Sequence, residues 1–213
     1  MDVRALSVEG AYAFTPQVHP DDRGLFVSPF QGPAFEGVSP RRRFPMAQSN
    51  HSVSRKGVVR GVHFTRTPPG TAKYVYCAHG ESMDFVVDLR VGSPTFGAWD
   101  MVVMSPRTFE AVYFPVGVGH AFVSLQDHTV MSYVITESYV PENELAISFF
   151  DPELGLGPLP EGLHITMSER DTKAVSLSEA RETGMLPRYE ESQRIEAATY
   201  GHAAPPVTDG AAT

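Results

Sequence analysis

The sequence is poor in cysteine and tryptophan, with one of each, and it has no long hydrophobic run. A single thiol, Cys77, allows no internal disulfide and is typical of a protein in a reducing compartment. No stretch reaches the roughly 18 apolar residues of a membrane-spanning helix. The N-terminus lacks the basic segment and apolar core of a signal peptide. We therefore expect a cytoplasmic protein in which Cys77 is a small buried hydrophobe.

Basic residues are also scarce, because 17 Lys and Arg against 25 Asp and Glu give a formal net charge of −8. A nucleic-acid binder would carry a basic footprint, so no nucleic-acid partner is expected. The arginine run at 41–43 lies in a segment rich in proline and glycine, and we expect it to be a solvated surface run. A small anionic ligand needs only a local cluster of cations and stays compatible with this charge.

The chain has 213 residues, of which 42% are hydrophobic, enough for one sizeable core. From about residue 24 to 150 it consists of short segments rich in aromatic and β-branched residues, separated by Gly, Pro and Asp turns. In one of them Met83 and Phe85 face one way, whereas Asp84 and Asp88 face the other. The pattern predicts an all-β sandwich or barrel.

One helix is indicated after this region. Ser176 and Glu179 form a capping box, and Gly184 stands at a C-cap position. The end of the chain, "YGHAAPPVTDGAAT", is rich in small residues and proline and lacks periodicity. We expect one domain over residues 1–190 with a short helical appendage, followed by a disordered tail over 191–213.

Two expected strands carry a polar residue on an otherwise apolar face. Lys73 shares a face with Val75, and Tyr133 shares a face with Met131. Each has a plain structural explanation, since a buried Tyr packs with one hydrogen bond and a Lys extends from a strand end. With Arg60 and His63 there are four such candidates. Because unpaired buried charge is costly, they are better explained as the lining of one cavity.

Strict alternation puts Arg60 and His63 on opposite faces of the strand "GVVRGVHFT". Gly61 lies between them and is a natural position for a β-bulge. A bulge there would turn both side chains towards the cavity. Without it, one of the two should lie outside.

The stretch "PVGVGH", ending at His120, fits the second half of the cupin pattern. A metal cupin also has two histidines one residue apart in its first half, yet here Thr65 stands where the second would follow His63. A metal such as zinc needs about three protein ligands. We therefore expect a double-stranded β-helix jelly roll, a cupin, without a metal. A metal-dependent cupin oxygenase or isomerase using His63 and His120 remains the alternative.

Nine motifs in order resemble the dTDP-4-dehydrorhamnose 3,5-epimerase family: "DDRGLF", "QSNHSVS", "GVVRGVHF", "AKYV", "DFVVDLRVGSPTFGAW", "FPVGVGHAF", "YVITESYVPENE", "DPELGL" and "SERD". The resemblance covers roughly residues 20 to 186. It implies a homodimeric jelly roll that acts on dTDP-4-keto-6-deoxyhexoses without metal or organic cofactor.

The resemblance also implies roles. The base falls on His63, supported by Asp171; Lys73 lies near the ketone, and Tyr133 is the acid. Tyr139 matches the aromatic residue that stacks on thymine. Some contacts near Arg23 would come from the partner subunit. The ligand-contacting positions are Arg23, Ser28, Gln48, Asn50, Arg60, His120, Tyr139, Glu144 and Arg170, where Arg170 replaces the usual lysine.

The chemistry needs these residue types. A 4-ketone acidifies the C–H bonds at C3 and C5, so inversion requires a base on one face and an acid on the other. A histidine, with a reference pKa of about 6.5, suits the first task, and a tyrosine, at about 10, stays protonated for the second. A carboxylate would fix the histidine tautomer, and a lysine would stabilise the enolate oxygen. Arginines hold a diphosphate.

Several positions depart from the rhamnose enzymes. Ser28 replaces a glutamate, Thr65 replaces a glutamine, and "GLGPLP" replaces a segment with tryptophan and proline. Such changes resemble the branch that makes deoxysugars for antibiotics, so inversion at C3 alone is favoured over inversion at C3 and C5. A sugar-nucleotide-binding cupin without catalysis stays open as well.

Three assignments have plain structural alternatives. Tyr139 could cover an apolar rim, Asp171 could be a turn residue before the helix, and Glu144 could be a surface carboxylate.

Overall fold

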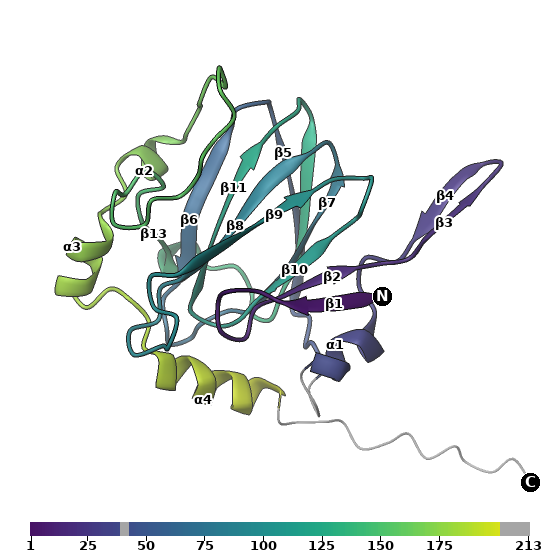
Figure 1. Ribbon diagram of the computed structural model, residues 1–213. Coiled ribbons are helices and arrows are strands. Elements are labelled where there is room, and N and C mark those ends of the chain that lie inside the picture. Colours follow the sequence, from purple (N-terminus) through teal and green to yellow (C-terminus); the bar gives the residue numbers. More distant parts are fainter. Residues whose placement is uncertain (39–42, 201–213) are drawn as a thin grey trace, which may run out of the picture.

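The computed structural model describes residues 1–38 and 43–200, and its main feature is two antiparallel sheets that face each other (Figure 1). The six-stranded sheet has the order β1 (Asp2–Ala5), β2 (Tyr12–Thr15), β10 (Ala111–Phe114), β7 (Lys73–His79), β12 (Thr129–Ile135) and β5 (Gln48–Ser54). The five-stranded sheet has the order β13 (Glu144–Ala146), β6 (Val59–Thr65), β11 (Val118–Ser124), β8 (Ser82–Asp88) and β9 (Trp99–Met104). The prediction of an all-β jelly roll is confirmed.

The alternation of apolar residues along the strands builds the core between the sheets. Val75 and Cys77 of β7 and Met131 of β12 pack there against Val86 of β8 and Phe122 of β11. Tyr133 packs against the same cluster, as its shared face with Met131 predicts. Cys77 is buried, and burial raises the pKa of its thiol to about 11. It is the small buried hydrophobe expected from the sequence.

Both sheets are also covered on their outer faces. Met83, Phe85 and Val87 of β8 point away from the inter-sheet core and belong to a cluster with Phe149 and Leu177 of the C-terminal segment. Helix α1 (Gly32–Val38) covers the six-stranded sheet, where Phe35 packs against Phe14 and Tyr113. All seven residues of β8 are therefore buried, including Asp84 and Asp88.

The described residues form more helices than the single one that the sequence pattern indicated. The expected helix is α3 (Leu177–Glu182), in which the Ser176 hydroxyl accepts a hydrogen bond from the backbone N–H of Glu179 and Gly184 has a φ of 69°. A short helix, α2 (Glu169–Thr172), and a 3-10 turn, η1 (Pro141–Asn143), were not expected. No helix in the described part of the chain is long and apolar enough to cross a membrane.

The expected tail over 191–213 is wrong in its first part, because helix α4 spans Tyr189–Tyr200. The helix was missed because its apolar residues are few and its docking is mainly polar. The rest of that expectation, residues 201–213, lies outside the described residues. In the arginine run, Arg41 and Arg42 also lie outside them, whereas Arg43 is exposed and pairs with Glu36 at 3.4 Å.

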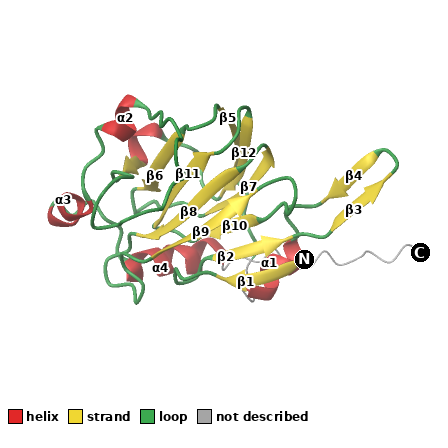
Figure 2. Ribbon diagram, turned by 45° about the horizontal axis from the view of Figure 1, so that its top comes forward, coloured by secondary structure: helices red, strands yellow, loops and turns green. Residues whose placement is uncertain are grey.

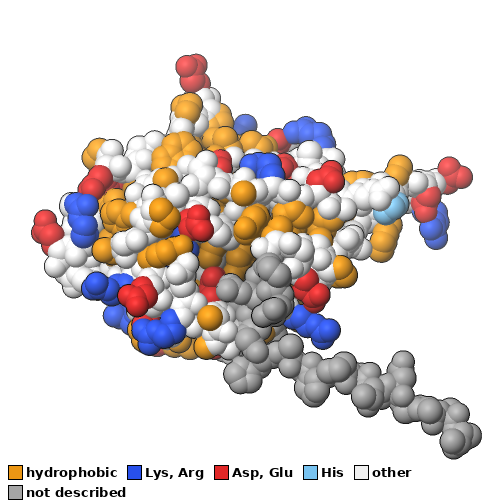
Figure 3. Space-filling model, turned by 60° about the horizontal axis from the view of Figure 1, so that its bottom comes forward, with side chains coloured by type: hydrophobic (Ala, Val, Ile, Leu, Met, Phe, Trp, Pro, Cys, Tyr) orange, Lys and Arg blue, Asp and Glu red, His pale blue; other side chains and the backbone are white. Residues whose placement is uncertain are grey.

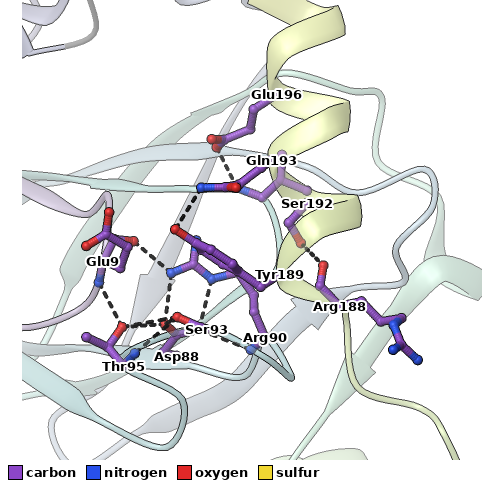
Figure 4. Close-up of polar contacts among 11 residues, drawn as sticks. Glu9, Asp88, Arg90, Ser93, Thr95, Arg188, Tyr189, Ser192, Gln193 and Glu196 are labelled. Carbon is purple, nitrogen blue, oxygen red and sulfur yellow. Dashed lines mark hydrogen bonds and ion pairs between the residues drawn. The ribbon is translucent and has the colours of Figure 1, made fainter.

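A buried polar network anchors the start of α4 (Figure 4). The Arg90 guanidinium donates to the Asp88 carboxylate at 2.8 and 2.9 Å and to the backbone carbonyl of Glu9 at 2.7 Å. The Tyr189 ring lies 5.0 Å from the guanidinium carbon. Burial by itself would raise the pKa of Asp88, but the hydrogen bonds from Arg90, Ser93 and Thr95 outweigh it and the pKa is lowered. The network holds an ionised pair that is almost fully buried.

Strands β3 (Val18–Asp21) and β4 (Gly24–Val27) form a hairpin that pairs with neither sheet and projects from the body (Figures 1 and 2). Leu25 and Phe26 are 52% and 66% exposed. In the space-filling view, hydrophobic atoms line this projection and charged atoms gather at its end (Figure 3). A two-stranded ribbon is marginally stable on its own in water, and an exposed apolar surface of this kind favours contact with another chain.

We expect Arg90→Ala to lower the free energy of unfolding by about 3–5 kcal/mol, because it leaves the Asp88 carboxylate buried without its cation. Chemical denaturation at pH 7 measures the change. Arg107→Ala is the matched control, since Arg107 pairs with Glu81 at the surface and its removal should cost about 1 kcal/mol or less. Equal losses in the two variants would contradict a special role for the buried pair.

Candidate active site

A cavity of about 510 Å³ opens between the two sheets and holds most of the predicted site residues. Nine of them line it: Arg60, His63, Lys73, His120, Tyr133, Tyr139, Glu144, Arg170 and Asp171. The lining also includes the apolar side chains of Phe122 and Ile135. The polar strand residues that the sequence singled out therefore share one cavity.

A bulge in β6 brings Arg60 and His63 to the same face, as expected. In the register of β6 and β11, His63 lies opposite His120 and Arg60 lies opposite Phe122. An advance of three residues along β6 therefore matches an advance of two along β11. Gly61 lies in this bulge with a φ of 110°, and a Cβ there would lie 2.8 Å from the Cα of Ala121. Only glycine fits such a conformation and such a close approach without strain.

His63 and Asp171 form a close histidine–carboxylate pair in the cavity. The Asp171 carboxylate lies 2.5 Å from Nε2 of His63, and Asp171 is 3% exposed. It is held at the start of α2, where its backbone N–H donates to the Ser168 hydroxyl. Asp171 is thus a helix residue whose side chain reaches the cavity, which answers the alternative of a simple turn residue.

The ionisation of this pair follows from burial and contact. Burial lowers the pKa of His63, and the Asp171 hydrogen bond opposes that shift without cancelling it. Burial would raise the pKa of Asp171, but the His63 contact and further hydrogen bonds from Ser168 and the Gly61 backbone lower it. At pH 7 the imidazole is therefore neutral beside a carboxylate. With Nε2–H donated to Asp171, the lone pair of Nδ1 is the one able to accept a proton.

Lys73 is held by a carboxylate inside the cavity. Its Nζ lies 3.7 Å from Glu144, and the two side chains are 12% and 11% exposed. The Thr65 hydroxyl donates to the other oxygen of Glu144 at 2.7 Å. Burial lowers the pKa of Lys73, and Glu144 opposes that shift. Glu144 is therefore no surface carboxylate, and Thr65, noted from the sequence only as a departure, holds it in place.

Tyr133 approaches the cavity from the sheet opposite His63. It lies on β12 beside Val75 of β7, whereas His63 lies on β6 of the five-stranded sheet. Burial raises the pKa of Tyr133, although nearby Arg60 opposes the shift, so the phenol stays protonated at neutral pH. A neutral imidazole and a protonated phenol thus line one cavity from the two opposed sheets.

A second histidine–carboxylate pair was not foreseen. Nε2 of His120 lies 3.0 Å from the Asp84 carboxylate, which is fully buried. Burial raises the pKa of Asp84, and His120 opposes that shift. The sequence did indicate that Asp84 lies on the face of β8 opposite Phe85. Alternation along one strand does not identify the partner of a side chain, so His120 could not be inferred.

The other four predicted residues do not line the cavity of the single chain. Gln48 is near its rim, because its side-chain carbonyl accepts from the backbone N–H of Tyr139 at 2.9 Å and its amide donates to Asn50 at 2.6 Å. Ser28 is half-buried after the hairpin, and Arg23 lies at the hairpin turn, 90% exposed and paired with Asp21. These four assignments stay predictions.

Each cavity histidine contacts one carboxylate, His63 with Asp171 and His120 with Asp84. Among the residues that the structure describes, no group of three or more His, Cys, Asp or Glu side chains is placed to hold a metal ion.

We expect Asp171→Asn to lower the pKa of His63 further, because the remaining influences of burial, Lys73 and Arg170 all act in that direction. An NMR titration of the imidazole nitrogens measures it. Glu169→Gln removes the same charge from an exposed position on α2 that pairs with Lys173, and it should leave the His63 titration unchanged. An unaltered His63 titration in Asp171→Asn would contradict the pairing.

Comparison with known proteins agrees on one family. The family model described as dTDP-4-dehydrorhamnose 3,5-epimerase matches residues 5–179. A dTDP-4-dehydro-6-deoxyglucose 3-epimerase of Streptomyces bikiniensis is 40% identical over 193 residues, covering 91% of this chain and 97% of that protein. A dTDP-4-dehydrorhamnose 3,5-epimerase of Mycobacterium tuberculosis is 40% identical over 196 residues, covering 92% and 96%.

Solved structures agree as well. The rmlC epimerase of Mycobacterium tuberculosis superposes with a TM-score of 0.89 at 40% identity, covering 93% of this chain and all of that chain. A 3′-monoepimerase from Streptomyces bikiniensis, in complex with dTDP-quinovose, gives a TM-score of 0.87 at 40% identity, covering 92% and 98%. The fold, the cavity and these matches lead to one conclusion: the chain belongs to the dTDP-4-dehydrorhamnose 3,5-epimerase family.

Proposed function

We propose that the protein epimerises a dTDP-4-keto-6-deoxyhexose at C3, without a metal or organic cofactor, in deoxysugar biosynthesis. The observation that carries the proposal is the opposed placement of a neutral base, His63, and a protonated acid, Tyr133, in one cavity. Inversion beside a ketone needs this arrangement, because the proton leaves one face of the carbon and arrives on the other.

In the proposed reaction Nδ1 of His63 takes the C3 proton, and the electron pair moves to the C4 oxygen as an enolate. Asp171 stabilises the imidazolium that forms. Lys73 lies ready to stabilise the enolate oxygen, with Glu144 and Thr65 fixing its position. Tyr133 then delivers its proton to the opposite face of C3. Exchange with solvent then returns a proton to Tyr133 and removes one from His63. The net reaction is therefore an isomerisation of the sugar, with no gain or loss of atoms.

Inversion at C3 alone is favoured over inversion at C3 and C5. Relatives of equal identity include both kinds, so their names do not separate the two. The proposal rests on the departures at Ser28 and Thr65, and Thr65 contacts Glu144, the partner of Lys73. We therefore expect the site beside the reacting ketone to be held differently from that of the rhamnose enzymes.

The remaining cavity residues suit the nucleotide. Arg60 and Arg170 offer guanidinium groups for the diphosphate, and Tyr139, 48% exposed at the rim, offers a ring on which thymine can stack. The relative in complex with dTDP-quinovose supports a dTDP-linked sugar as the ligand.

The proposal is tested by incubating the protein with dTDP-4-keto-6-deoxyglucose in deuterated water and following the sugar by proton NMR and mass spectrometry. Deuterium at C3 alone is expected, above a control without enzyme. Label at both C3 and C5 would make it a double epimerase. No label at either carbon, or an activity that needs stoichiometric iron, nickel or manganese, would overturn the proposal.

Tyr133→Phe should separate the two proton transfers. Formation of the C3 epimer is expected to fall by about 10²- to 10⁴-fold, because the acid is gone. Deuterium should still enter C3 with retained configuration, because His63 can remove and return the proton on its own face. Tyr76→Phe, on β7 but outside the cavity lining, is the control and should epimerise normally. Loss of exchange in Tyr133→Phe would contradict the assigned roles.

We also propose a homodimer in which the β3–β4 hairpin reaches the partner's site and contributes Arg23. Leu25→Asp with Phe26→Asp should give a monomer by sedimentation velocity, because the exposed apolar pair would lose its contact. Val103→Asp alters another exposed apolar residue and should leave the oligomeric state unchanged. Arg23→Ala should leave the dimer intact and raise KM for the dTDP-sugar. A dimer that survives the hairpin substitutions would contradict this arrangement.

A further inference from the structure

A second hollow, of about 650 Å³, lies next to the active-site cavity and is rich in cations. We call it the cationic groove, defined by Arg55, Lys56, Arg60, His164 and the residues that line it with them. Arg60, Val58 and Thr166 line both the groove and the cavity, so the two spaces meet at Arg60. None of the roles described above uses Arg55, Lys56 or His164.

The backbone of the groove is firmly held. Residues 55–58 form the turn between β5 and β6, in which the N–H of Val58 donates to the carbonyl of Arg55 at 3.2 Å. The backbone N–H of Thr166 donates to the carbonyl of Gly57 at 2.9 Å, and a Cβ on Gly57, with its φ of 82°, would collide with the carbonyl of His164. The turn therefore packs directly on the segment 162–166, and the cations project from a fixed frame.

The charges of the groove are unbalanced. Among the described residues, no ion pair involves Arg55, Lys56 or Arg60, although acidic residues outnumber basic ones in the chain. One carboxylate, Asp127, lines the groove, and it accepts the backbone N–H of Lys56 at 3.0 Å. Three cationic side chains and the single carboxylate of Asp127 leave the groove with an excess of positive charge. The electrostatic potential beside the cavity is therefore positive.

We infer that the cationic groove is an anion-binding extension of the active site, which attracts and stabilises the diphosphate of a nucleoside-diphosphate sugar through Arg55 and Lys56. The inference rests on the proposed function and deepens it. Arg60, at the junction, would contact the diphosphate directly. Arg55 and Lys56 act over a longer range, which raises the affinity most at low ionic strength, because the screening length is then about 30 Å and falls to a few ångströms in strong salt.

The test measures the affinity for dTDP and for thymidine, which lacks the phosphates, by ligand-observed NMR in low and high salt. For Arg55→Gln with Lys56→Gln the Kd for dTDP should rise about three- to tenfold in low salt, and the difference should shrink in high salt. The Kd for thymidine should not change. Exchanging the two residues, Arg55→Lys with Lys56→Arg, keeps the charge and should restore the affinity for dTDP.

Arg107→Gln with Arg194→Gln is the matched control, because it removes two exposed cations that line neither hollow. Unchanged dTDP affinity in the groove variant, an equal loss in the control, or an equal weakening of thymidine binding would each overturn the inference.

The affinity measurement does not depend on turnover, so the inference and the proposed function can fail separately. A protein that shows the groove effect but labels no carbon would refute the proposed function alone. If the protein epimerises but the groove variant binds dTDP as tightly as the unaltered protein, the groove inference alone is refuted. If the protein binds no dTDP, both are refuted.

Discussion

The pairing of β6 with β11 around Gly61 is the constraint on which the site depends. One extra residue in β6 turns both Arg60 and His63 to the cavity and sets His63 directly beside His120. A side chain at position 61 would meet the backbone of β11, so the bulge requires glycine. The Gly61 backbone also donates to Asp171, the carboxylate that pairs with His63. A single glycine thus aligns His63, the carboxylate of Asp171 and the side chain of Arg60.

Buried charge in this fold is arranged in pairs with different consequences. Asp88 and Arg90 are almost fully buried, and the hydroxyls of Ser93 and Thr95 also donate to the Asp88 carboxylate. This pair does not line the cavity. The pairs at His63 and Lys73 face the open cavity, where burial and an opposite charge act against each other on the pKa values. The net result is a lowered pKa at both groups, which suits the proton transfer that we propose beside a ketone.

The surface of the chain has two features that enter the proposals. The hairpin exposes apolar side chains and Arg23 away from the body, whereas the cationic groove gathers cations next to Arg60. An acidic protein can bind an anionic ligand in this way, because the local field at the site depends on nearby charges and not on the net charge. The apolar outer faces of both sheets are covered by α1 and the C-terminal segment, which leaves the hairpin as a prominent exposed apolar feature.

The sequence by itself determined the all-β architecture, the inward faces of β7 and β12, the α3 cap and the bulge at Gly61, since these depend on residue spacing and on local backbone preferences. It also identified nine residues that share the cavity, through motif order and not through spacing alone. The tertiary structure alone decided that Asp84 meets His120, that Thr65 holds Glu144, and that α4 docks on a buried ion pair. These contacts join segments 36 residues apart or more, and alternation along a strand says which face a side chain is on but not what lies across from it.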